Sequence, residues 1–176
     1  IVNTHHAYVQ RELPRLTALI AKVRGVHGKN HPELAQIEPV FAAISAEMMM
    51  HMMKEEQILF PYIVDMEQAA QGKGPQPMPM FGTVQNPVRM MMMEHDAAGA
   101  HLVRIRELSS NFTVPADGCT SYRVLYEALA AFEADLHQHI HLENNILFPR
   151  AIEMEDAAEL RQGTSVHKHE RRLCFA

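Results

Sequence analysis

The stretch His-Met-Met-Lys-Glu-Glu-Gln-Ile-Leu-Phe-Pro occupies residues 51–61, and a close copy, His-Ile-His-Leu-Glu-Asn-Asn-Ile-Leu-Phe-Pro, occupies residues 139–149. Each copy has a histidine, a glutamate four residues later and the same Ile-Leu-Phe-Pro ending. In an α-helix, side chains at positions i and i+4 share a face, one turn apart. Each copy therefore predicts an imidazole beside a carboxylate, which is a unit of metal ligands.

The repeat extends further, because His6 lies 45 residues before His51 and His95 lies 44 residues before His139. The chain thus reads as two similar halves, and four helices would contribute four histidines and two glutamates. With two metals and two bridging carboxylates, each metal would hold two nitrogens and two oxygens. That shell is incomplete for an octahedral ion and leaves room for an oxo or water bridge and an outside ligand. The predicted ligands are His6, His51, Glu55, His95, His139 and Glu143.

Composition limits the class of protein. The 176 residues are 47% hydrophobic, enough for one domain with a substantial core. A net charge of -5 does not favour nucleic acid as a partner. No apolar run approaches a membrane span and no signal peptide is evident, so a cytoplasmic protein is expected. Cys119 and Cys174 form neither a C-x-x-C motif nor a disulfide framework. The oligomeric state, a dimer included, stays open.

Helical spacing of apolar residues, with no alternating strand pattern, predicts an all-α protein. Its architecture is expected to be an antiparallel four-helix bundle over residues 1–160 with a central dinuclear metal site, followed by a polar tail over residues 161–176. Four helices are predicted, over residues 3–24, 32–60, 86–109 and 120–149. A crossover between the two halves is predicted at residues 71–82.

Some helix ends are also predicted. Pro61 should kink or end its helix. Asn86 followed by proline should cap the third helix, and Thr120 or Ser121 the fourth. After Pro149, a short helix to residue 158 and a loosely held polar segment from residue 162 are expected.

The other histidines are expected to lie away from the centre. His137 and His141 lie two residues either side of His139, about 200° around the helix, and should face solvent. His5 points about 100° from His6, although a one-residue change of register would alter that. His27 is roughly 30 Å along the helix from His6. Structural roles are expected for His31, His101, His167 and His169.

Glu47 and Asp135 each precede a paired histidine by four residues. A metal-bound imidazole usually donates its other N–H to a carboxylate or carbonyl, so both are candidates for that contact. An ordinary helix charge explains them equally well.

The choice of metal follows from the ligand types. Imidazole and carboxylate without thiolate suit iron, manganese or zinc, and a dinuclear bundle site with bridging glutamates favours iron. Zinc would prefer a closed tetrahedral shell. The methionine runs at residues 48–53 and 90–93 could suggest copper(I). Consecutive methionines point all round a helix, however, so packing explains them better.

With these motifs the chain resembles the hemerythrin-like di-iron proteins, most closely the bacterial iron-sulfur cluster repair (RIC or ScdA-like) group. Besides the two repeated stretches, the resemblance rests on His-His-Ala-Tyr from His5, Val-His-Gly around His27, and Glu-His-Asp-x-x-Gly from Glu94. It extends to about residue 152 and does not include the short cysteine-containing N-terminal domain of many family members.

The resemblance implies a hemerythrin-like fold and two iron ions, oxo- or hydroxo-bridged, with the four histidines as terminal ligands and the two glutamates as bridges. It also implies repair, by iron donation, of iron-sulfur clusters damaged by nitric oxide or oxidative stress, with damaged iron-sulfur proteins as partners. Two alternatives use the same site: a module that binds, senses or buffers nitric oxide or dioxygen, and reduction of nitric oxide at the di-iron centre. Whether the protein is an enzyme therefore stays open.

Overall fold

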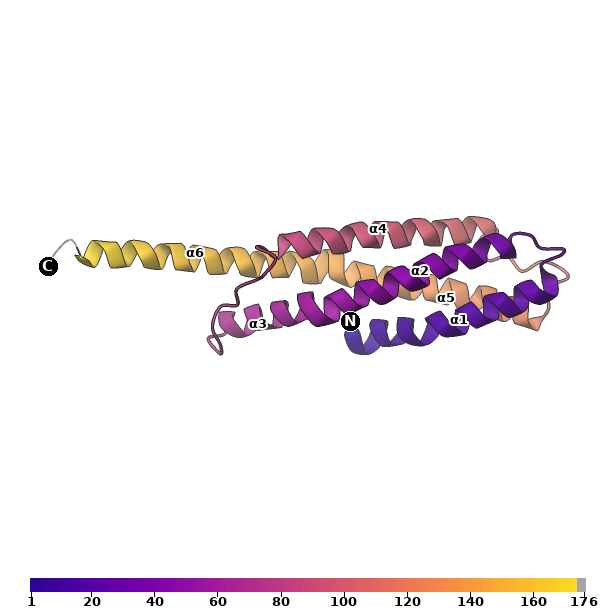
Figure 1. The fold of residues 1–176 in the computed structure, drawn as a ribbon, viewed down its shortest axis with the longest axis horizontal. Coiled ribbons are helices and arrows are strands. Elements are labelled where there is room, and N and C mark those ends of the chain that lie inside the picture. The colour runs from indigo at the N-terminus through magenta and orange to yellow at the C-terminus, as the bar shows by residue number, and fades with distance from the viewer. Residues whose placement is uncertain (174–176) are drawn as a thin grey trace. The chain divides into compact units, whose positions relative to one another are not determined.

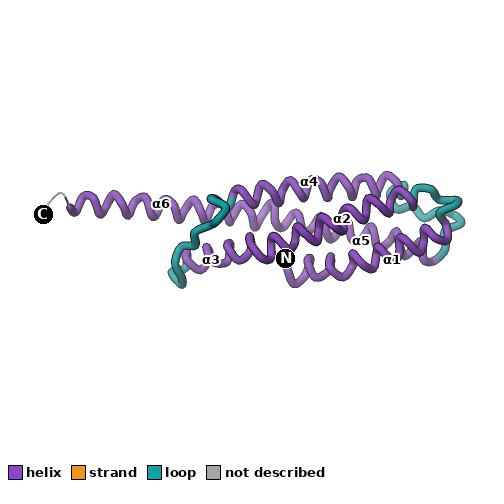
Figure 2. Tube along the Cα trace, in the orientation of Figure 1, coloured by secondary structure: helices purple, strands orange, loops and turns teal. Residues whose placement is uncertain are grey.

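The computed structural model describes the backbone of residues 1–173 and the side chains of residues 1–161, and this part of the chain is helical without a strand. The all-α prediction is confirmed (Figures 1 and 2). The helices are α1 (Ala7–His27), α2 (Leu34–Lys54), α3 (Phe60–Ala70), α4 (Gln85–Leu108), α5 (Thr120–Leu142) and α6 (Phe148–Leu173). Three π-helical turns adjoin them: η1 (Val2–His6), η2 (Glu55–Leu59) and η3 (Glu143–Leu147).

The chain divides into two compact units, residues 1–53 with 91–142, and residues 54–90 with 143–176. In the first unit, α1 and α5 run antiparallel, as do α2 and α4. In each pair, residues near the start of one helix contact residues near the end of the other. Between α1 and α5 these contacts are His6 with His139 and His27 with Cys119. Between α2 and α4 they are Gln36 with Arg104 and His51 with Glu94. The predicted antiparallel four-helix bundle is confirmed.

The apolar core of the first unit follows from the helical spacing of the sequence. In α1 the fully buried side chains are spaced three or four residues apart, as one face of a helix requires. Aromatic rings from different helices meet edge to face in this core, Phe41 on Phe132 at 5.7 Å between ring centroids. The core thereby fixes the register of the helices that carry the histidines.

Pro61 was expected to kink or end its helix, and it does not end it. The helix widens into the π turn η2, in which the Phe60 N–H donates to the Glu55 carbonyl, five residues earlier. A proline ring clashes with the carbonyl four residues before it, here that of Gln57. A π turn at this point changes the position of that carbonyl, so the chain passes the proline without leaving the helical conformation. The second copy of the motif has the equivalent turn, η3, before Pro149.

One expectation about a helix end was wrong. The helix after Pro149 does not stop near residue 158, because the backbone of α6 is helical to Leu173. The side chains of residues 162–173, with His167 and His169, and the whole of residues 174–176 lie outside the described part. The crossover, expected at 71–82, is confirmed as irregular and reaches α4 at Gln85 (Figure 2). Over the described residues, no helix combines the length and apolar character needed to cross a bilayer.

The second unit is organised around a buried carboxylate on α6. Glu155 accepts hydrogen bonds from the Tyr62 hydroxyl at 2.8 Å, the Val84 backbone N–H at 2.9 Å and the Thr83 hydroxyl. A carboxylate at this position satisfies backbone donors that the start of α4 leaves open. The predicted cap, Asn86, instead donates to the Phe81 carbonyl. Burial, and then the bond to Glu155, raise the pKa of Tyr62 above its ordinary value.

Replacing Glu155 should therefore destabilise the second unit. Glu155→Ala leaves three donors unpaired, two of them buried, and is expected to lower the free energy of unfolding by about 2 kcal/mol. Glu153→Ala, two residues earlier and exposed, should change it by less than about 0.5 kcal/mol. Denaturant unfolding followed by circular dichroism measures both, and equal effects would contradict the role given to Glu155.

Candidate metal centre

Two histidine pairs lie in the first unit, each joining residues far apart in the sequence. His6, at the end of η1, and His139, near the end of α5, are buried with their Nε2 atoms 3.1 Å apart. His51 on α2 and His95 on α4 are also buried, with their Nε2 atoms 3.0 Å apart.

The two pairs have nearly the same geometry. Their ring centroids are 4.8 and 4.7 Å apart, and both pairs have an interplanar angle of 55°. Two nitrogens bound to one ion at about 2.1 Å, with a right angle between them, would themselves be about 3.0 Å apart. The spacing within each pair is therefore what two neighbouring ligands of one metal require.

Two glutamates complete the set. Glu55 opens η2 and Glu143 opens η3, and both are fully buried. Two groups of four side chains each bring one ligand atom per residue within 4.8 Å of one another, and both glutamates belong to both groups. The groups are His6, Glu55, His139 and Glu143, and His51, Glu55, His95 and Glu143. The six residues expected from the sequence thus lie together, in two sets that share their carboxylates.

The donors fit a cation of the iron or manganese type. Buried carboxylates are costly unless they are paired or coordinate a metal. Imidazole nitrogen and carboxylate oxygen are ligands for such ions, and neither group contains a thiolate. Four ligand atoms per group also leave positions of an octahedral shell for small molecules.

One carboxylate that spacing did not identify orients a histidine of this set. The Nδ1–H of His51 donates to Glu94 Oε2 at 2.9 Å, which leaves the lone pair of Nε2 directed at His95. Glu94 lies on α4, whereas spacing along the chain relates His51 only to residues of its own helix. In the sequence, the only indication of this role is that Glu94 directly precedes His95. To use it, one must know that α2 and α4 are neighbours.

Glu47 and Asp135, the two candidates for the contact behind a ligand histidine, each contact another histidine. A carboxylate oxygen of Glu47 is 3.4 Å from Nε2 of His101, at a partly exposed position. Asp135 Oδ1 is 3.0 Å from Nδ1 of His5. The His5 ring in turn stacks on the ring of His139, with 5.6 Å between centroids and an interplanar angle of 8°.

The remaining histidines divide by exposure. His137 and His141 are exposed, as predicted. His5 was expected to point about 100° away from His6; it is nevertheless buried beside the proposed centre. His27, His31 and His101 belong to neither of the two groups. Among the methionines, Met48, Met52 and Met91 are buried in packing roles, while Met49, Met50 and Met93 are exposed.

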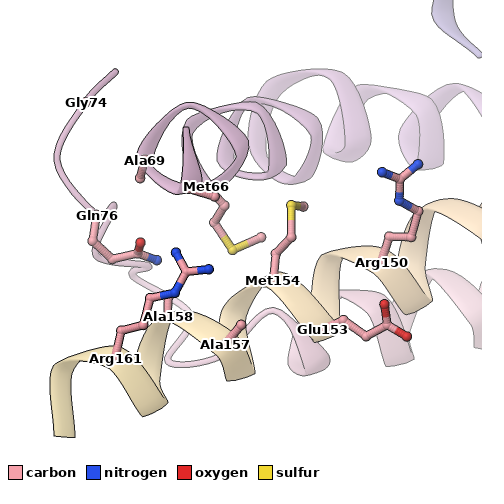
Figure 3. A pocket seen from close by; sticks show the side chains of 11 residues that line it. Met66, Ala69, Gly74, Gln76, Arg150, Glu153, Met154, Ala157, Ala158 and Arg161 are labelled. Carbon is pink, nitrogen blue, oxygen red and sulfur yellow. The ribbon is translucent and has the colours of Figure 1, made fainter. Parts of the chain in front are cut away.

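A cavity of about 400 Å³ in the second unit offers no comparable set of ligands. Figure 3 shows Met66 from α3 opposite Met154 from α6, with Arg150 and Arg161 also on α6. The only carboxylate among its lining residues is Glu153, and none of them is a histidine or cysteine. This cavity is therefore not a metal site.

Comparison with known proteins agrees with this geometry. The family described as hemerythrin HHE cation binding domain matches residues 1–151, and again residues 86–174. The chain is 40% identical over 156 residues to a Haemophilus influenzae protein named probable iron-sulfur cluster repair protein, covering 86% of this chain and 62% of that one. It is 38% identical over 155 residues to the iron-sulfur cluster repair protein YtfE of Yersinia pseudotuberculosis and of Yersinia pestis, covering 88% of this chain and 64% of each. The chain thus spans less than two thirds of the length of these relatives.

The contact between His51 and Glu94 predicts a difference between two acidic residues. Glu94→Gln removes the charge that orients and polarises the imidazole and should weaken iron binding about 10- to 100-fold. Glu47→Gln, which changes a carboxylate bonded to His101, should leave the affinity unchanged. Competition with a coloured chelator measures both dissociation constants. A larger loss in Glu47→Gln would instead support the contact predicted from spacing.

Proposed function

Because this chain belongs to the family of hemerythrin HHE cation-binding domains, we propose that it holds a non-haem centre of two iron ions. We further propose that it takes part in the repair of iron-sulfur clusters damaged by nitric oxide or oxidative stress. Damaged iron-sulfur proteins are its proposed partners, and donation of iron is the proposed activity.

One observation carries the two-iron proposal: Glu55 and Glu143 belong to both groups of ligand atoms. If each group holds one ion, His6 and His139 are the terminal ligands of one, and His51 and His95 of the other. The two carboxylates then bridge the ions, and an oxo or hydroxo bridge between the ions accounts for further positions. Iron is preferred because dinuclear carboxylate centres in helical bundles commonly hold it.

The ligand set also suits iron that must leave. When bound, the two iron ions would be a source of iron for a damaged cluster that has lost its own. The chain holds them with neutral imidazoles and carboxylates, which protonation can detach, and without thiolates. The bundle excludes bulk water from all six side chains, while the incomplete shells admit a small ligand such as nitric oxide. The names of the relatives favour repair over reversible binding of nitric oxide or dioxygen and over nitric oxide reduction.

The assignment of the bridges has a direct test. The wild-type protein should bind two iron ions per chain, with magnetic coupling between them visible in Mössbauer spectra. Glu55→Ala should lose iron or uncouple the two spins, because this carboxylate belongs to both groups. Glu56→Ala, the adjacent residue and a member of neither group, should keep both properties. A reproducible content of one ion per chain, or equal effects at positions 55 and 56, would refute the bridged centre.

A second experiment separates repair from binding. The iron-loaded protein, given a reductant, should restore activity to an iron-sulfur enzyme damaged by nitric oxide and should lose iron as it does so. His139→Ala should not restore activity, whereas His141→Ala, on the same helix but exposed, should do so as well as the wild type. If iron stays bound while nitric oxide or dioxygen binds and leaves reversibly, the protein is a binding module and the repair proposal fails.

A further inference from the structure

A second group of reactive side chains lies in the first unit, where α1 ends and α5 begins. Cys119 is exposed, and its Sγ is 3.1 Å from Nε2 of His27, a residue 92 positions away in the sequence. A thiol beside an imidazole is the arrangement that activates a cysteine as a nucleophile. Neither residue belongs to the groups of candidate metal ligands.

The backbone around Cys119 adds to this activation. The residue directly precedes α5, and backbone N–H groups of Ser121 and Tyr122 donate to its sulfur. Donors at a helix N-terminus stabilise a negative charge placed there. Gly118 keeps the preceding turn tight, since a Cβ at this position would lie 2.8 Å from Val114 Cγ1. The sulfur is therefore held at the helix start while remaining open to solvent.

The imidazole of His27 is held in place from two sides. The ring of Tyr122 packs edge-on against it at 5.3 Å between centroids, and the ring of His31 lies 6.1 Å away. His31 in turn contacts the carboxylates of Glu33 and Asp117, each at 2.9 Å.

These contacts make the thiolate accessible near neutral pH. The bond to His27, followed by the backbone donor of Tyr122, lowers the pKa of Cys119 to about 7. Desolvation lowers the pKa of the His31 ring, but its bonds to Asp117 and Glu33 together outweigh that effect, so the pKa is raised. An ordinary thiol is only a few per cent ionised at pH 7, so the sulfur here has a much larger reactive fraction.

We propose that Cys119 is a reactive thiolate that exchanges with small disulfides and forms a mixed disulfide at the surface of the chain. The Cys119 sulfur attacks one sulfur of the small disulfide, a new S–S bond forms, and the original S–S bond breaks. The departing thiolate takes a proton from the His27 imidazolium. The small disulfide is the oxidant: the Cys119 sulfur is oxidised to the mixed disulfide, and one half of the small disulfide is reduced to a released thiol.

A metal site at the same place is the competing interpretation, and the geometry does not favour it. Among the described residues only two groups bring three or more histidine, cysteine or acidic ligand atoms within 4.8 Å of one another, and both lie at the proposed iron centre. Cys119 and His27 are thus a pair and not part of a closed set of ligands. The proposal is independent of iron and goes beyond the repair function.

The test uses the full chain with Cys174→Ser, which leaves Cys119 as its only cysteine. Mass spectrometry should show one glutathione added per chain on treatment with glutathione disulfide, and none in the further variant Cys119→Ser. The rate of reaction with a chromogenic disulfide, measured from about pH 5 to about pH 10, should have its midpoint near that of a thiol activated by a neighbouring histidine, well below about 8.5.

His27→Gln should move this midpoint to the ordinary thiol range of about 8.5 and slow the reaction at pH 7 about tenfold. His31→Gln removes a neighbouring imidazole that does not contact the sulfur, so it should leave the midpoint near its original value. Circular dichroism checks that both variants fold. A midpoint at or above about 8.5 in the chain with only Cys174 replaced would overturn the proposal without any further variant. So would an unchanged rate in folded His27→Gln, or complete protection of the thiol by one equivalent of zinc.

Discussion

Two carboxylates, Glu55 and Glu143, lie fully buried in a set that also contains four imidazoles. Placing charged groups away from water is among the costliest steps in folding unless a partner of opposite charge is supplied. The four histidines come from four helical segments and the two glutamates from two π turns, and their donor atoms lie close together. We regard this electrostatic requirement as the constraint on which the bundle depends, because a bundle of this size could otherwise bury leucine in the same positions.

The six residues of the proposed centre could be found from the sequence because covalent spacing along a helix determines which side chains share a face. The pairing of His51 with Glu55 needs only an i and i+4 relation, and the repeat at His139 removes the ambiguity of a single match. Glu94 could not be found in this way. Its contact with His51 joins two helices, and the helix register that produces it depends on core packing rather than on local spacing.

The helix ends show the same limit for a different reason. Pro61 was expected to kink or end its helix, and a separate short helix was expected after Pro149, since proline lacks an N–H and crowds the preceding turn. The chain instead contains π turns, η2 and η3, which relieve the crowding within a continuous helical path. Such a turn is specified by the balance between local strain and the contacts of the flanking residues. In both copies it begins at the buried glutamate, so the irregularity coincides with a proposed ligand.

The two histidine pairs have nearly the same geometry, but the groups that contact the far side of their rings differ. Their internal distances and angles agree closely, but His51 donates to the carboxylate of Glu94, whereas His139 is stacked against the ring of His5. A carboxylate behind an imidazole makes it a stronger electron donor, which favours the higher oxidation state of the ion it binds. Glu94 would thereby raise the donor strength of His51 toward any metal ion that this histidine holds, so a residue on α4 would tune a ligand on α2.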